Sequence, residues 1–238
     1  MNLYIYKNQK QECMSIQIQP SIFNFLNALK ENNTREWFAE NKAWFTEEEI
    51  QLKFFFTKVM EGLREEDDIE GMKAYRIYRD VRFSKDKSPY KIYRSCSYKR
   101  ATEALRGGYH VEITPGGSFL ACGFWQPNKE DLLRIRKEFE MDSDEINEII
   151  NSVSIQKIFG GFHDGETLKT APKGFDKEHK DIELIRKKDF ILLRKFTDEE
   201  VLDPNFYKEV IKSFKAARPY LDYMSDVLTT NLNGESLI

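Results

Sequence analysis

The residues best suited to chemistry lie in a basic stretch, RIYRDVRFSKDKSPYK, which runs from Arg76 to Lys91. Residues 76–106 hold ten Lys or Arg and three acids, a net charge of +7, in a chain whose formal net charge is −3. Arginine offers a planar fork that binds phosphate or carboxylate through two parallel hydrogen bonds. We therefore predict a site for an anionic small molecule. The binding candidates are Arg76, Arg79, Arg82, Lys87, Tyr90 and Lys173.

Three residues are candidates for acid/base catalysis. Asp80 lies inside the basic stretch, and His110 and Glu112 share one face of a predicted strand. They would act together if the stretch beginning at Arg76 lies beside that strand. The ordinary interpretation of His110, which we favour, is a histidine hydrogen-bonded within the sheet. Ser84 and Asp86 are expected to shape a loop through bonds to the backbone.

An acidic segment competes for the same positive charges. Residues 31–70 hold twelve acids and five bases, a net charge of −7. Arg76, Arg79 and Arg82 would then form ion pairs with acidic helices instead of binding a ligand, and we hold the two alternatives equal. Apolar residues interleave with the basic ones, so part of the stretch is expected to be buried. These are Tyr75, Ile77, Phe83 and Tyr90.

The surrounding pattern predicts a single α+β domain. Its mostly antiparallel sheet includes a hairpin at 108–126 and packs against N-terminal and C-terminal helices. Ser21, Thr34, Thr46, Asn128, Asp142 and Thr197 are the predicted starts of helices, and a last long helix follows Pro204. Period-two apolar residues predict an extended segment over 75–83, and FILLRKF predicts a strand at 190–196. We expect an extension at 1–20, the domain at 21–230 and a tail at 231–238.

Composition narrows the function classes. The chain has 238 residues, 40% of them hydrophobic and 32% charged, and no apolar run long enough to cross a bilayer. Three cysteines, three histidines and the absence of CxxC and HExxH argue against a zinc site or a disulfide framework. We expect a cytoplasmic protein with no cofactor, metal or membrane partner. Nucleic acid is an unlikely partner, and the oligomeric state stays open.

The basic stretch also resembles the hallmark segment of the domain of unknown function 2461 family. NTREWF at 33–38, the glycine- and aromatic-rich hairpin ending in GFWQP, and LKTAPKGFD at 168–176 support the resemblance. It implies a single compact domain found mostly in bacteria and brings no established substrate or cofactor. Two functions therefore stay open: an anion-binding protein, with or without enzymatic activity, and a non-catalytic module that binds protein or nucleic acid.

Overall fold

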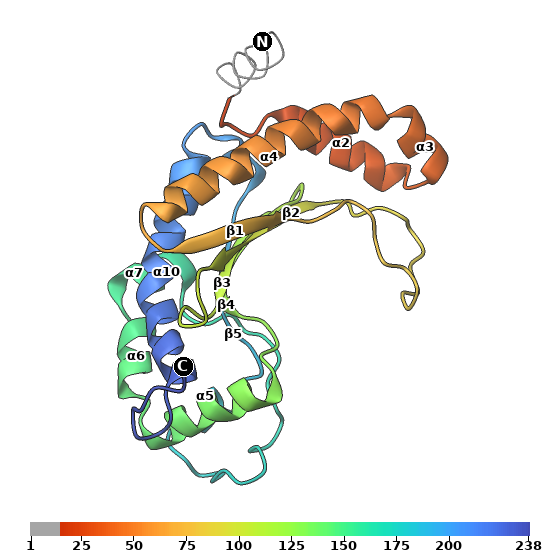
Figure 1. Cartoon of the computed structure of the whole chain (residues 1–238). Helices are drawn as coiled ribbons and strands as arrows, with labels where there is room; N and C mark the ends of the chain where they lie inside the picture. Colours follow the sequence, from red (N-terminus) through yellow and green to blue (C-terminus); the bar gives the residue numbers. More distant parts are fainter. Residues whose placement is uncertain (1–14) are drawn as a thin grey trace.

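The computed structural model describes residues 15–238 and contains an antiparallel sheet (Figure 1). The order of its five strands in the sheet is the same as their order in the chain, so strands that are neighbours in the sequence pair with each other. The predicted α+β class is confirmed. The strands are β1 (Ile69–Ala74), β2 (Arg94–Arg100), β3 (Gly108–Ile113), β4 (Phe119–Phe124) and β5 (Phe190–Lys195).

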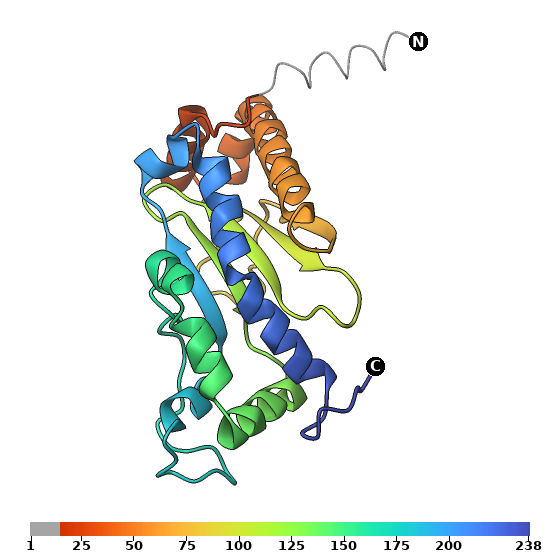
Figure 2. The same cartoon turned by 90° about the vertical axis from the view of Figure 1, so that its left-hand side faces the viewer.

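Helices cover one face of this sheet. Figure 2 shows the long C-terminal helix crossing that face diagonally, with the long N-terminal helix beside it. The helices are α2 (Pro20–Glu31), α3 (Arg35–Glu40), α4 (Lys42–Arg64), α5 (Lys129–Met141), α6 (Asp144–Ile150), α7 (Val153–Phe159), α8 (Ile182–Ile185), α9 (Asp198–Leu202) and α10 (Phe206–Thr229).

The core lies between the sheet and these helices. Alternate residues of β3 and β4, among them Tyr109, Val111 and Leu120, are buried on this face. Tyr109 packs against Phe214 of α10, with ring centroids 5.0 Å apart. The intervening positions point to the opposite face, which the helices of residues 15–238 leave uncovered (Figure 1).

The predicted hairpin at 108–126 is confirmed, and the structure settles its register. Val111 pairs with Leu120, and Glu112 pairs with Phe119. At the turn the Ser118 hydroxyl donates to the Thr114 carbonyl at 2.9 Å and accepts from the Thr114 N–H at 3.0 Å. His110 and Glu112 therefore do share one face of β3, as the alternation predicts.

Two predicted helix starts in the N-terminal third are wrong. Helix α4 begins at Lys42, and Thr46 lies inside it. The Thr46 hydroxyl donates to the Lys42 carbonyl at 2.8 Å. Ser21 does not cap α2, because the helix already begins at Pro20. The Ser21 hydroxyl instead donates to Glu48 at 3.0 Å. The cap predicted at Thr34 is confirmed, since its side chain accepts from the Trp37 N–H.

Later caps follow the sequence more closely. Asn128 accepts hydrogen bonds from the N–H groups of Glu130 and Asp131, and Thr197 forms a capping box with Glu200. Asp142 was expected to cap a helix, but α6 begins after Ser143. Polar side chains therefore predict these starts to within a residue or two.

The extended segment predicted over 75–83 is wrong as a strand. β1 ends at Ala74, and the chain forms a long loop, residues 75–93, before β2 begins. Tyr78 and Tyr90 form an isolated bridge at its base. Beyond this bridge the carboxylates of Asp80 and Asp86 accept hydrogen bonds from backbone N–H groups two residues on, which favours a turn over a ladder.

The expected burial of this loop holds only at its base. Ile77 and Tyr90 are buried, and Tyr90 stacks on Phe38 of α3 with ring centroids 4.1 Å apart. Phe83 was also expected to be buried, yet it is 96% exposed. The loop is thus anchored at its base and presents a bare aromatic ring at its tip.

The structure describes only residues 15–20 of the extension predicted at 1–20. Residues 1–14 lie outside the described part of the chain, so the extension stays a prediction there. Ile18 belongs to the core, and the Gln17 amide donates to the Leu202 carbonyl at 2.7 Å. Within residues 15–238, no helix combines the length and the apolar character that a bilayer-spanning segment needs.

A buried ion pair connects the sheet to the helices. Arg100 of β2 donates from Nε to Asp67 at 2.7 Å, and both side chains are buried. Tyr109 donates to the same carboxylate at 2.5 Å, and Arg100 also donates to Ser225 of α10 at 3.1 Å. Burial opposes the charge of Arg100, but its bonds to Asp67 and Asp222 raise its pKa overall.

We predict that Asp67→Ala destabilises the protein by about 3–5 kcal/mol, because it removes the buried partner of Arg100 and leaves this buried charge with only the part-exposed Asp222. The matched control is Glu70→Ala, which removes the partner of Lys99 in an ion pair whose side chains are 56% and 73% exposed. This control is expected to cost less than about 1 kcal/mol. Urea unfolding measures both, and equal losses would contradict the assignment.

Candidate functional site

The uncovered face of the sheet has small residues at its centre and large ones around them. Gly108, Ala121 and Gly123 lie at the centre, on β3 and β4. Gly123 has φ +124, and a Cβ there would lie 2.2 Å from the Phe190 carbonyl oxygen, so this position requires glycine. Larger side chains surround them: Tyr75, Phe119, Trp125 and Leu193.

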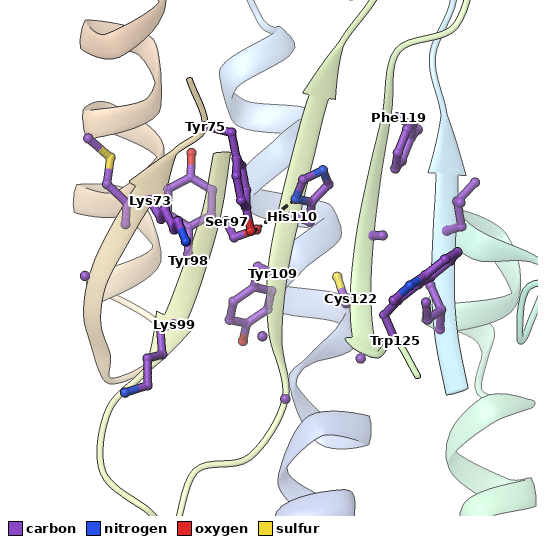
Figure 3. A pocket seen from close by; sticks show the side chains of 18 of the residues that line it. Lys73, Tyr75, Ser97, Tyr98, Lys99, Tyr109, His110, Phe119, Cys122 and Trp125 are labelled. Carbon is purple, nitrogen blue, oxygen red and sulfur yellow. Dashed lines mark hydrogen bonds between the residues drawn. The ribbon is translucent and has the colours of Figure 1, made fainter. Parts of the chain in front are cut away.

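This arrangement leaves a cavity of about 980 Å³ on the open face (Figure 3). The volume and the mainly apolar lining suit a small organic molecule. Trp125, 69% exposed, stands at one end of the cavity near His163, and Tyr75 and His110 stand at the other. The cavity is preformed in the structure of the protein alone.

A chain of polar side chains crosses the apolar lining. The Tyr75 hydroxyl lies 3.2 Å from Ser97 Oγ, and Ser97 Oγ lies 2.9 Å from His110 Nδ1. Figure 3 shows these side chains converging from the end of β1, from β2 and from β3. Strand pairing places them, because Ser97 lies directly opposite His110 in the register.

Burial changes the protonation of the groups around this chain. Desolvation, and then the nearby Lys91 cation, lower the pKa of His110 from its usual 6.5. Desolvation likewise raises the pKa of Glu112 above 4.5, although its bond from Thr114 works in the opposite direction. His110 is therefore held in its neutral form near neutral pH, where it can accept a proton.

Two lysines lie beside the Tyr75 ring at this end of the cavity. Lys73 lines it, with Nζ 5.3 Å from the centroid of the Tyr75 ring, and Lys91 Nζ lies 5.4 Å from the same centroid. Among the described residues neither lysine forms an ion pair with a carboxylate, whereas Lys99 at the rim pairs with Glu70. Lys73 and Lys91 are thus available to an anionic group.

The predicted site residues do not form one cluster. His110 and Glu112 lie on the open face beside Lys91, which is the last residue of the basic stretch. Arg79 and Arg82 instead pair with acids of their own loop, Asp86 and Asp80 respectively. The base of the loop therefore reaches the cavity and its tip does not.

The remaining candidates contribute little to this cavity. Asp80 is bonded to Arg82, which lowers its pKa and makes it a weak base. Tyr90 is buried against Phe38, and the Lys87 ammonium donates to the Val81 carbonyl. Lys173 is exposed, and Arg76, also exposed, lies outside the lining. Their role as ligand-binding residues stays a prediction.

The competing ion-pair interpretation applies to a different set of arginines. Arg94 donates to Glu49 of α4 at 2.9 and 2.8 Å, and Arg100 pairs with Asp67. These pairs do join the basic segment to the acidic one. Within residues 15–238, no group of three or more His, Cys, Asp or Glu side chains is placed to hold a metal ion.

Comparison with known proteins supplies a family. The family described as conserved hypothetical protein (DUF2461) matches residues 21–223. The chain belongs to this family. No curated protein and no solved structure is significantly similar to it. Membership in DUF2461 thus agrees with the sequence resemblance and assigns no reaction.

Sequence reasoning missed Tyr75, Ser97 and Lys73 as site residues. Ser97 lies in RSCSYKR, which the charge count treated as part of a basic segment, although it forms strand β2. Its polar and charged residues at every second position, Ser95, Ser97 and Lys99, were the available signal for a strand with one open face. Arg94 and Arg100, which look solvent-facing in the sequence, are 2% and 1% exposed.

We predict that His110 titrates below 6.5, because burial and the Lys91 charge disfavour its imidazolium. Lys91→Gln removes that charge and is expected to raise the pKa of His110. Histidine ring-proton NMR over a pH series measures both values, with His110→Gln used to assign the signal. An unchanged titration in Lys91→Gln would show that Lys91 does not act on this ring.

Proposed function

We propose that this protein binds a small molecule that has a flat apolar body and an anionic group, in the cavity of the open sheet face. The observation that carries the proposal is an apolar cavity of about 980 Å³ with Lys73 on its lining and Lys91 beside the lining residue Tyr75, both free of carboxylate partners in the described chain. Phe119 and Trp125 supply aromatic surface for the body of the ligand. Lys73 and Lys91 supply charge for its anionic group.

Anilinonaphthalene sulfonate is a suitable probe, because it joins aromatic rings to one anionic group. We expect saturable binding with increased fluorescence. Ala121→Trp should abolish it, since Ala121 lies on the cavity floor opposite His110. Binding that is unaffected by Ala121→Trp would place the probe elsewhere and reject the cavity.

Two probes, one with a sulfonate and one without, test whether the anionic group contributes to binding. Lys73→Gln should weaken sulfonate binding about tenfold, which corresponds to about 1.4 kcal/mol. N-phenylnaphthylamine has similar rings without the sulfonate, and its affinity should not change. Lys157→Gln, on an exposed position of α7, is the matched control. Equal effects of Lys73→Gln on both probes would remove the anion from the proposal.

A second candidate function is favoured by the tip of the loop at 75–93. Phe83 is 96% exposed, and the Arg82 guanidinium lies 5.9 Å from its ring centroid. The Arg79–Asp86 pair braces the tip, so the ring is held out by an ordered loop. An exposed ring beside cations is typical of surfaces that bind single-stranded nucleic acid, which needs stacking and charge together.

Fluorescein-labelled oligothymidylate tests this second candidate. Binding should weaken steeply with salt, and Phe83→Ser should weaken it further without changing the binding of anilinonaphthalene sulfonate. Phe83→Ser should also leave the free energy of unfolding within about 0.5 kcal/mol, because the ring makes no core contact. Salt-independent binding, or none, would reject nucleic acid as the partner of this loop.

A further inference from the structure

Tyr75, Ser97 and His110 form a hydrogen-bonded chain that fixes one nitrogen of the His110 ring. Ligand binding alone does not require such a chain. We propose that His110 is a catalytic base that removes a proton from the ligand of the open-face cavity, with Ser97 and Tyr75 as positioning residues. This rests on the proposed function, because the substrate must first occupy the cavity. The proposed substrate class is a small carbon acid with an anionic group, such as a carboxylate-bearing carbonyl compound.

The geometry assigns different roles to the two nitrogens of the His110 ring. Nδ1 is held by Ser97 Oγ at 2.9 Å, and among the described residues Nε2 has no hydrogen-bond partner. The ring lies on the cavity lining, and its cross-strand neighbour on β4 is Ala121, whose small side chain leaves room above the ring. A ligand in the cavity can therefore approach Nε2.

The hydrogen-bond chain remains complete in both protonation states of His110. In the neutral tautomer that acts as the base, Nδ1 carries the ring proton and donates to Ser97, Ser97 donates to the Tyr75 oxygen, and Nε2 has a free lone pair. The same bonds persist when Nε2 takes a proton. The Nδ1–H bond to Ser97 then becomes charge-assisted, which is the stronger kind, so the chain stabilises the imidazolium that the reaction forms.

The charged groups around the ring suit this role. Lys91 and Lys73 approach from the loop and β1, Lys99 lies on β2, and Glu112 lies two residues along on β3. Tyr93 of the loop is a further titratable group in this part of the structure, and burial raises its pKa. Strand β4 contributes only the uncharged Phe119 and Ala121. Burial and the Lys91 cation lower the pKa of the free ring and keep it neutral, and Lys73 and Lys91 stabilise negative charge that develops on the substrate.

The step balances without an added reagent. His110 Nε2 takes the proton from the substrate carbon, and the C–H electron pair moves into the adjacent carbonyl, forming an enolate beside Lys73. Where the substrate gives a conjugated dienolate, return of the proton from Nε2 to its γ-carbon completes the turnover. Where the substrate has a leaving group on the carbon β to the carbonyl, expulsion of that group forms the new double bond and the leaving group takes the proton from Nε2.

Ser97 is better placed as part of the chain than as a nucleophile. Acyl transfer needs free N–H donors that converge on the oxyanion. Ser97 lies inside β2, which is paired on both sides with β1 and β3. The neighbouring strand N–H groups are therefore engaged in the sheet ladders.

Nitrobenzisoxazole tests the base directly. Removal of its ring C–H proton sends the electron pair into a new C≡N bond, breaks the N–O bond and releases a coloured cyanonitrophenolate. We expect saturable turnover whose rate rises with pH through an inflection below 6.5, the pH at which His110 becomes neutral. His110→Gln should lower the rate about tenfold or more and remove the inflection.

The roles of Ser97 and Tyr75 are tested by the pH of the inflection, which a merely structural role would not change. Ser97→Ala should move the inflection to lower pH, because the imidazolium loses its hydrogen-bond acceptor, and Tyr75→Phe should move it less in the same direction. His179→Gln is the matched control: this ring bonds to the Glu140 carbonyl, outside the cavity, and its loss should change nothing. Binding of anilinonaphthalene sulfonate shows that each variant keeps its cavity.

Each other outcome overturns the inference. A rate that is equal in His110→Gln and wild type, or an inflection that disappears in His163→Gln instead, assigns the base to another group. Inflections that stay fixed in Ser97→Ala and Tyr75→Phe remove the role of the chain. If the sulfonate probe binds while turnover is absent, the catalytic inference fails alone; if the probe does not bind either, the proposed function fails with it.

Discussion

The buried pair between Arg100 and Asp67 is the constraint on which the rest of the structure depends. It joins β2 to the turn after α4, and through Ser225 it also reaches α10. Arg94 at the opposite end of β2 makes a second such contact, with Glu49 of α4. Charges buried in this way must be matched in place, so they fix which face of the sheet the two long helices cover. The other face stays open as a consequence.

An uncovered apolar face is unusual for a sheet, and its details separate it from an ordinary solvated surface. A solvated face carries polar residues at its outward positions. Here the outward positions of β4 are Phe119, Ala121 and Gly123, and two of the polar residues on this face, Ser97 and His110, bond to each other. Small residues enclosed by aromatic ones produce a hollow, and a hollow with a few directed polar groups is how a binding site is built.

The sequence predicted what depends on near neighbours. Alternation gave the hairpin and the shared face of His110 and Glu112, and polar side chains gave the caps at Thr34 and Asn128. Near-neighbour patterns could not predict the cavity. It depends on the register of β2 against β3 and on a sheet face that no described helix covers at these two strands. Charge counting failed for a related reason: it could not tell Arg79, which pairs with Asp86 seven residues away, from Arg100, which pairs with a distant acid.

Pairing within the protein also decides which part of the basic stretch can serve a ligand. Two of its arginines are occupied by Asp80 and Asp86, and these pairs stiffen the tip that carries Phe83. Lys91 lies at the base of the loop, where it acts on His110 and shares the Tyr75 ring with Lys73. The stretch that dominates the sequence therefore contributes to the cavity through one end only. Because the base of the loop contacts the body of the protein and the arginines of its tip pair within the loop itself, substitutions in one are separable from substitutions in the other, and two functions on one loop can be distinguished by experiment.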